Sequence, residues 1–164
     1  MTDKTVLVTD FTWPAPDIEV EVLKEVNAKL LLAPSSDEST LIELVAQADA
    51  ILTCFAHVTE SVIRAGNKLQ VIGRYGIGVD NIDRAEASKK GIIVMNTPFG
   101  NMITTAEHAI AMMFSVARQI PEANASTQAG KWEKSKFMGV ELTNKIVGVI
   151  GAGNIGGVFC DRAR

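Results

Sequence analysis

The sequence predicts an α/β protein in which a doubly wound parallel sheet is followed by long helices and one further strand. Three observations lead to this prediction. Over the first hundred residues, short β-branched runs alternate with amphipathic stretches, as in a parallel sheet with helices on both faces. After Asn96-Thr97-Pro98 a long helical pattern replaces this alternation. A glycine-rich segment, residues 151–156, then follows the last apolar run.

The alternating part holds five predicted strands with helices between them. The strands are expected at residues 5–9, 30–33, 50–53, 70–73 and 92–95, and the helices at residues 17–27, 37–47, 59–65 and 82–89. Asp17 and Ser36 stand where a side-chain oxygen accepts from the first amides of a helix, and Gly66 and Gly91 stand where helices end. Because the strands and their crossovers make a complete set, residues 1–98 are predicted to form a flavodoxin-like substrate domain.

The helical part, residues 99–164, begins at a predicted capping box, in which Thr104 and Glu107 each satisfy a backbone amide. Apolar residues then follow at helical spacing in two stripes: Ile103, Ala106, Ile110, Met113, Ala117 and Ile120, and Met102, Ala109, Met112 and Val116. A helix with two apolar stripes needs cover on more than one side. This predicts a homodimer contact through residues 102–120, and burial within one chain is the alternative.

A second helix, from Pro121 to about Gly130, is predicted to precede a polar loop and a last strand at residues 146–150. Gly151-Ala152-Gly153-Asn154-Ile155-Gly156 then leads into a helix. Such glycines allow a tight turn, close approach of the backbone to a pyrophosphate, and close packing of helix on strand. The motif predicts dinucleotide binding, with a glycine-rich turn that binds nothing as the alternative. The acidic residue expected about 20 positions later falls beyond Arg164, so the predicted Rossmann domain is incomplete.

A second glycine cluster, residues 73–81, follows the fourth predicted strand, where open parallel sheets bind their ligands. Its glycines allow backbone amides to face a carboxylate, and Arg74 adds positive charge. The alternative is a tight turn in which Asp80 and Asn81 cap the following helix. The residues alone favour neither interpretation.

Composition and charge pattern indicate a soluble globular protein and argue against nucleic-acid and membrane partners. Hydrophobic residues make up 47% and charged residues 21%, as in a soluble globular protein. The 16 Lys and Arg and 19 Asp and Glu are interleaved, so no nucleic-acid partner is expected. The N-terminus shows no export signal, and no apolar run has membrane-spanning length, so a cytoplasmic protein without a membrane partner is expected. Cys54 and Cys160 lack metal-ligand spacing and are predicted to be free, buried thiols, with no metal site.

Several motifs, in order and spacing, resemble the D-isomer-specific 2-hydroxyacid dehydrogenases, and the D-3-phosphoglycerate dehydrogenases most closely. They are Gly76-Ile77-Gly78-Val79-Asp80-Asn81-Ile82-Asp83, Asn96-Thr97-Pro98, Ala106-Glu107, Ala117-Arg118-Gln119-Ile120-Pro121, Gly130-Lys131-Trp132 and the loop at 151–156. The resemblance is to the N-terminal portion of such a protein. It implies hydride transfer between NAD and a D-2-hydroxy acid, as in serine biosynthesis. It also implies a substrate domain completed by a returning C-terminal segment, an NAD domain in between, and a dimer interface formed by the helices after Asn101.

The resemblance also implies roles for individual residues. The Ile77 and Gly78 amides are expected to hold the substrate carboxylate, with Ile77 also near the nicotinamide and Asn101 beside the substrate. The cofactor is expected to be bound by Gly151, Gly153, Asn154, Ile155 and Gly156. The family's catalytic Arg, Glu and His come later in the chain than Arg164, and neither His57 nor His108 matches the catalytic position. The 164-residue chain alone is therefore predicted to be inactive.

One loop departs from the phosphoglycerate dehydrogenases. These proteins typically place an Arg and a Lys after the third strand, where this chain has Thr53-Cys54-Phe55-Ala56-His57-Val58-Thr59. Arg and Lys recognise phosphate, so their absence removes a reason to expect a phosphorylated substrate, although His57 is a candidate partial substitute. An unphosphorylated acid such as glyoxylate or hydroxypyruvate is the rival substrate. A non-catalytic dimerising or NADH-sensing module is the rival from another class of protein.

Overall fold

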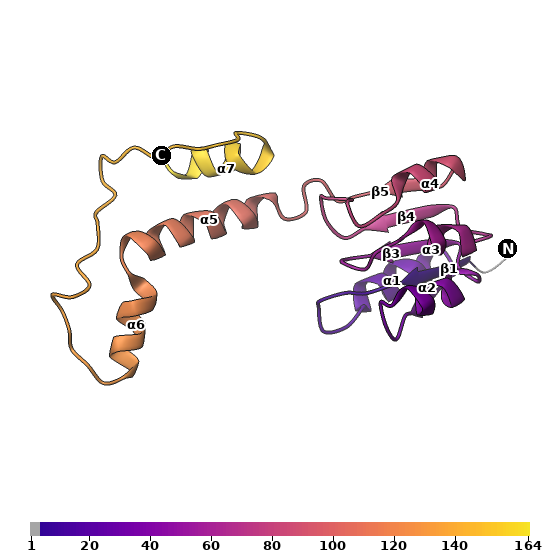
Figure 1. The fold of residues 1–164 in the computed structure, drawn as a ribbon, viewed down its shortest axis with the longest axis horizontal. Helices are drawn as coiled ribbons and strands as arrows, with labels where there is room; N and C mark the ends of the chain where they lie inside the picture. The colour runs from indigo at the N-terminus through magenta and orange to yellow at the C-terminus, as the bar shows by residue number, and fades with distance from the viewer. Residues whose placement is uncertain (1–3) are drawn as a thin grey trace. The chain divides into compact units, whose positions relative to one another are not determined.

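The computed structural model describes residues 4–164, which belong to two compact units (Figure 1). The first unit ends at Gly100 and contains the sheet. The second comprises Asn101–Arg164 and is built from helices and extended loops.

The first unit is built on a parallel sheet of five strands: β1 (Lys4–Val8), β2 (Ala28–Leu32), β3 (Ala50–Thr53), β4 (Val71–Arg74) and β5 (Ile93–Met95). Their order is β2-β1-β3-β4-β5, and each neighbouring pair is parallel. This is the flavodoxin-like doubly wound order, so the predicted fold class is confirmed. The order reverses between β1 and β3, and such folds bind ligands at the carboxyl ends of the strands beside that point.

Helices α2 (Glu38–Val45), α3 (Glu60–Ala65) and α4 (Arg84–Lys89) cover one face of the sheet. Apolar side chains from the strands and from these helices form a dry core there, each with 0% of its surface exposed: Leu7, Ile51, Ile72, Leu41, Val45, Val62, Ile63 and Ala87. Each large aliphatic side chain buried in this way contributes roughly 1.5–3 kcal/mol. The core therefore fixes the sheet whose carboxyl edge presents the candidate loops.

The other face of the sheet carries α1 (Asp17–Glu25), which packs against β2. Over β3, β4 and β5 this face is bare, with Ile93 62% and Met95 59% exposed. A hollow of about 380 Å³ lies on it, lined by Leu23 and by residues of β1, β3, β4 and β5. Parallel sheets are normally covered on both faces. The elements predicted to complete this domain therefore leave part of one face of the sheet uncovered.

The helix starts differ from the predicted ones in detail. Asp17 and Ser36 make no capping hydrogen bond. The cap position of α2 is Asp37, whose carboxylate accepts from the Ser35 hydroxyl at 2.6 Å and whose amide donates to the same hydroxyl at 3.1 Å. Helix α4 begins after Asp83, whose side chain accepts from the Glu86 amide. At the helix ends, Gly66 caps α3 and Gly91, at φ +68°, follows α4, as predicted.

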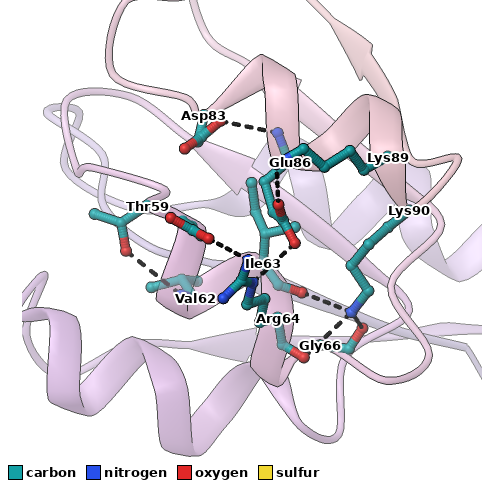
Figure 2. Close-up of polar contacts among 10 residues, drawn as sticks. Thr59, Val62, Ile63, Arg64, Gly66, Asp83, Glu86, Lys89 and Lys90 are labelled. Carbon is teal, nitrogen blue, oxygen red and sulfur yellow. Dashed lines mark hydrogen bonds and ion pairs between the residues drawn. The ribbon is translucent and has the colours of Figure 1, made fainter.

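A polar network that the sequence did not predict joins α3 to α4 (Figure 2). The Glu86 carboxylate is buried and accepts from Arg64 Nε at 2.9 Å and from Lys89 Nζ at 3.1 Å. Lys90 Nζ donates to the carbonyls of Ile63, Arg64 and Gly66 at 3.0, 3.2 and 3.3 Å. The Ile63 and Gly66 carbonyls also accept from the Gly66 and Leu69 amides, at 3.2 and 3.4 Å, so the ammonium adds a charged donor to carbonyls at the end of α3.

The second unit contains α5 (Met102–Ala117), α6 (Ile120–Gln128) and α7 (Asn154–Arg162). The predicted capping box is wrong: Asn101 is the N-cap of α5, and Thr104 already lies inside the helix. The reason is that the Asn101 carbonyl accepts from both the amide and the hydroxyl of Thr105, at 2.9 and 2.7 Å. Pro121 lies in the first turn of α6 and Gly130 follows its end at φ +72°, both as predicted.

The strand predicted at residues 146–150 is absent. This segment is extended but unpaired, and Ile146 and Ile150 are 99% and 105% exposed. A β-strand needs a neighbouring strand for its amides and carbonyls. The described part of the second unit contains no other strand, so apolar pattern alone does not form one here.

Helix α7 packs along α5, which covers part of the first apolar stripe (Figure 1). Ala106 is fully buried, and Arg162 of α7 pairs with Glu107 of α5 at 3.1 Å. Burial within one chain therefore accounts for one face of α5. Met112 and Val116 of the second stripe remain exposed, at 54% and 75%, as does Ile103 at the start of the first stripe, at 49%. The homodimer contact through residues 102–120 stays a prediction.

Both cysteines are free, but only Cys54 is buried; Cys160 on α7 is half-buried, so its predicted burial is wrong. In residues 4–164 no helix has the combined length and apolar character required to cross a membrane.

Candidate functional site

The first candidate loop follows β4 at the carboxyl edge of the sheet. Within β4, a Cβ on Gly73 would lie 2.8 Å from a methyl carbon of Leu52, its register partner on β3. At Gly76, with φ at +155°, a Cβ would lie 1.4 Å from Nη1 of Arg74. The Arg74 guanidinium thus occupies the space beside Gly76. The positive φ accounts for glycine at position 76, whereas the contacts at both positions are with movable ends of side chains.

The next two residues, Ile77 and Gly78, present free backbone amides. The Asn96 side chain donates to the Ile77 carbonyl at 2.8 Å, and the Thr97 amide donates to the Gly76 carbonyl at 2.9 Å. With the carbonyls held in this way, neither the Ile77 nor the Gly78 amide donates a hydrogen bond to any residue that the structure describes. Consecutive unpaired amides of this kind suit a small anion such as a carboxylate.

The alternative role of this loop, capping the helix after it, is wrong for Asp80 and Asn81. Helix α4 is capped by Asp83. The Asn81 side chain instead donates to the Ala56 carbonyl at 2.8 Å, and the Asn81 carbonyl accepts from the Val58 amide at 2.8 Å. Asn81 therefore ties the loop after β4 to the loop after β3.

Asp10, directly after β1, holds the loop after β3 from the other side. Its carboxylate accepts from the amides of Cys54 and Phe55 at 2.9 and 2.6 Å, and from the Thr9 hydroxyl at 2.8 Å. Burial by itself raises the pKa of Asp10, but these hydrogen bonds together outweigh it and hold the pKa below its usual value. Sequence reasoning missed Asp10. The available signal was a carboxylate at the end of a strand beside the topological switch point.

The loop after β3 contains no Lys or Arg that could bind a phosphate, and its His57 lines the adjoining hollow. Thr53 is fully buried and its hydroxyl donates to the Ala56 carbonyl at 3.1 Å, so it faces away from solvent. Phe55 is 63% exposed, and His57 is exposed. A hollow of about 450 Å³ lies beside this loop, and the charged groups that line it are the carboxylates Asp10, Asp37 and Glu38. Their charge opposes the binding of a phosphate.

The second candidate loop, in the second unit, connects residues 146–150 to α7. Gly151 has φ +91°, a conformation that favours glycine. A Cβ on Gly156 would lie 2.1 Å from the Gly151 carbonyl oxygen, whereas one on Gly153 would meet no atom within 4 Å. Gly151 therefore allows the tight turn, Gly153 leaves space for a ligand to approach the backbone, and Gly156 allows the start of the helix to pack closely on the turn. These are the three requirements of a pyrophosphate-binding loop.

The start of α7 supplies the donors for this loop. The first helical hydrogen bond runs from the Gly157 amide to the Gly153 carbonyl at 2.7 Å, and Gly153 provides no side-chain cap. The amides of Asn154, Ile155 and Gly156 precede that bond, so they are the unpaired donors of the helix start. Such amides and the helix dipole favour a phosphate. The residues thus fit the pyrophosphate of a dinucleotide.

Asn101 belongs to the second unit and is the N-cap of α5. Its carbonyl is used by Thr105, but its side chain makes no hydrogen bond to the part of the chain that the structure describes. The exposed carboxamide is therefore available to a ligand. His108 lies exposed on α5, as expected for a residue on a helix face.

Comparison with known proteins identifies the family. The sequence model described as "D-isomer specific 2-hydroxyacid dehydrogenase, catalytic domain" matches residues 6–154. The chain belongs to this family. The motif resemblance is thereby confirmed over nearly the whole chain.

Named relatives agree with this assignment. The chain is 45% identical over 152 residues to the D-3-phosphoglycerate dehydrogenase of Synechocystis sp., covering 92% of this chain and 27% of that protein. It is 50% identical over 121 residues to the same-named protein of Homo sapiens, covering 74% and 23%. A solved 3-phosphoglycerate dehydrogenase of Entamoeba histolytica with bound NAD+ has a TM-score of 0.78 at 27% identity, covering 99% and 51%. The chain thus spans about a quarter of these curated relatives and half of this solved structure.

Proposed function

We propose that this chain forms part of an NAD-dependent oxidoreductase that transfers a hydride between NAD and a D-2-hydroxy acid or its 2-oxo form. The observation that carries the proposal is the presence of two loops with unpaired amides, Ile77–Gly78 for a carboxylate and residues 151–156 for a pyrophosphate. Family membership and the NAD+-bound neighbour from Entamoeba histolytica support both assignments. When bound, the cofactor supplies the hydride chemistry, and the protein binds and orients the reactants.

The proposed roles follow from these donors. The amides of Ile77 and Gly78 hold the substrate carboxylate. The resemblance further assigns Ile77 to the nicotinamide and the exposed Asn101 carboxamide to the substrate. The pyrophosphate is held by the turn and by the helix start after it: Gly151, Gly153, Asn154, Ile155 and Gly156.

An unphosphorylated substrate is favoured over phosphoglycerate. The loop after β3 has a buried Thr53 and an exposed Phe55 and supplies no Lys or Arg to a phosphate, and the hollow beside it is lined by three carboxylates and His57. A charge-assisted hydrogen bond contributes about 1.5–3 kcal/mol, which corresponds to roughly 10- to 150-fold in affinity. Without such contacts, a 3-phosphorylated acid gains little over its unphosphorylated counterpart.

The exposed apolar surfaces support an assembled protein larger than this chain. The bare face over β3, β4 and β5 supports the returning segment that the resemblance implies, because a buried parallel sheet requires cover on both sides. The exposed stripe on α5 supports a homodimer through residues 102–120, because exposed apolar patches of this kind mark contact surfaces.

The test of the proposed function uses this chain extended through the complete NAD domain. Reduction of NAD is followed with D- and L-2-hydroxy acids, and kcat/KM is compared for 3-phosphoglycerate and an unphosphorylated D-acid. Turnover of D-acids with little preference for the phosphate is expected. Reduction by neither enantiomer, with NADH still bound in a calorimetric titration, would instead favour a non-catalytic NADH-sensing module. We also propose that the 164 residues alone show no turnover, because the described part of the second unit contains no sheet on which a dinucleotide could bind.

A further inference from the structure

Aromatic side chains from the loops after β1 and β4 meet at the carboxyl edge of the sheet, beside the proposed carboxylate site. Phe11 and Trp13 follow β1, with ring centroids 5.6 Å apart. Trp13 meets Tyr75, which follows β4, edge to face at 4.8 Å. Arg74 Nε is a buried donor without a hydrogen-bond partner among residues 4–164, whereas the Tyr75 hydroxyl faces the Glu19 carboxylate, and burial together with that carboxylate raises the pKa of Tyr75. An unpartnered buried donor indicates a site that a ligand completes.

Phe55 and Arg74 extend this cluster toward solvent. The Arg74 guanidinium carbon lies 6.0 Å from the centroid of the Phe55 ring, within the range of a cation–π contact. Thr53 and Arg74 are register partners on the adjacent strands β3 and β4. The Phe55 ring and the Ile77 and Gly78 amides therefore lie on neighbouring loops of one edge. The Asp10 carboxylate fixes the Phe55 amide at 2.6 Å, so the ring is presented by an anchored backbone.

We propose that Phe55 and Arg74 determine substrate specificity, and that the acid whose carboxylate binds Ile77 and Gly78 carries an aryl group that packs against this pair. The inference rests on the proposed function, because it needs the carboxylate site. The planar guanidinium and the exposed ring suit a third planar group. The substrate class is thus a 3-aryl-2-hydroxy acid or the corresponding 2-oxo acid.

The test is an NMR titration of the 164-residue chain with three D-2-hydroxy acids that differ at one carbon: phenyllactate, lactate and 3-phosphoglycerate. The backbone amides of Ile77 and Gly78 report the carboxylate, and the indole of Trp13 reports the aryl group. The variant is Phe55→Leu, which keeps the amide that Asp10 binds. The control is Phe137→Leu, which removes the ring that lies 5.4 Å from Lys136 Nζ in the second unit.

All three acids are expected to shift the Ile77 and Gly78 amides. Phenyllactate is expected to bind roughly 2- to 13-fold more tightly than lactate, the range of one aromatic contact, and to shift the Trp13 indole. Phe55→Leu removes that advantage and Phe137→Leu retains it. Equal affinity for phenyllactate and lactate, or no effect of Phe55→Leu, overturns the inference and leaves the carboxylate site intact. If none of the acids shifts Ile77 or Gly78, the proposed function fails as well.

Discussion

The hydrogen bonds to Asp10 make a quantitative prediction for Asp10→Asn. The carboxylate uses both oxygens, one for the Cys54 amide and the other for the Phe55 amide. Asparagine keeps one acceptor oxygen and turns an NH2 group toward the other amide. One charge-assisted hydrogen bond is lost, so the free energy of unfolding should fall by about 1.5–3 kcal/mol at neutral pH. Urea denaturation followed by circular dichroism measures this change.

The pH dependence tests whether the charge is responsible. Because the pKa of Asp10 is lower in the folded protein than its ordinary value of 3.8, its contribution is complete above 3.8. This contribution is lost as the pH falls through the lower folded-state pKa. The free energies of unfolding of the unsubstituted protein and of Asp10→Asn should therefore converge in acid. Asp17→Asn is the control, since Asp17 is exposed and makes no capping bond. Equal stability at pH 7, or a difference that persists unchanged in strong acid, would refute the reasoning.

Three further variants test other parts of the structure. Gly156→Ala should distort the turn, because a Cβ at this position would lie 2.1 Å from the Gly151 carbonyl oxygen. NADH binding by the extended protein should therefore weaken. Gly157→Ala is the control: its Cβ would meet no atom within 4 Å, so NADH binding should stay intact. Met112→Ser with Val116→Ser should shift the sedimentation coefficient of a dimer toward the monomer while changing thermal stability little, because both side chains are exposed. Lys90→Met should lower the free energy of unfolding by about 0.3–1 kcal/mol in urea titrations, because the end of α3 loses a cation. Lys89→Met is the control, because it leaves in place the hydrogen bonds from Lys90 to the carbonyls at the end of α3.

The five strands of the sheet were predicted well because the burial of their apolar side chains determines where they form. Each strand of the first unit has a core-facing residue that the helices cover, such as Ile51 and Ile72, and the apolar pattern reports that burial directly. The same pattern failed at residues 146–150, because a strand also requires a backbone partner, and periodicity carries no information about its presence. The pattern therefore predicts which segments are apolar more reliably than which of them pair.

The caps and the site anchors were predicted less well, because several polar residues in one turn compete for the same amides. Ser35, Ser36 and Asp37 are all suitable caps, and the Ser35–Asp37 hydrogen bond decides between them. Asp10 accepts from the Cys54 and Phe55 amides, 44 and 45 positions away, and the Asn81 side chain donates to the Ala56 carbonyl, 25 positions away. Contacts at such separations depend on the strand order, which the sequence does not specify residue by residue.

Asp10 and Phe55 connect stability to specificity at this edge of the sheet. If the Asp10 carboxylate fixes the backbone that presents the Phe55 ring, Asp10→Asn should reduce both the free energy of unfolding and the preference for an aryl acid. Phe55→Leu should reduce the preference alone, because the ring is 63% exposed and the amide that Asp10 binds remains. In the double variant the loss of preference should equal that of Phe55→Leu, because the position of an absent ring has no consequence. Additive losses of preference would show that Asp10 acts on the aryl acid by a route that does not involve Phe55.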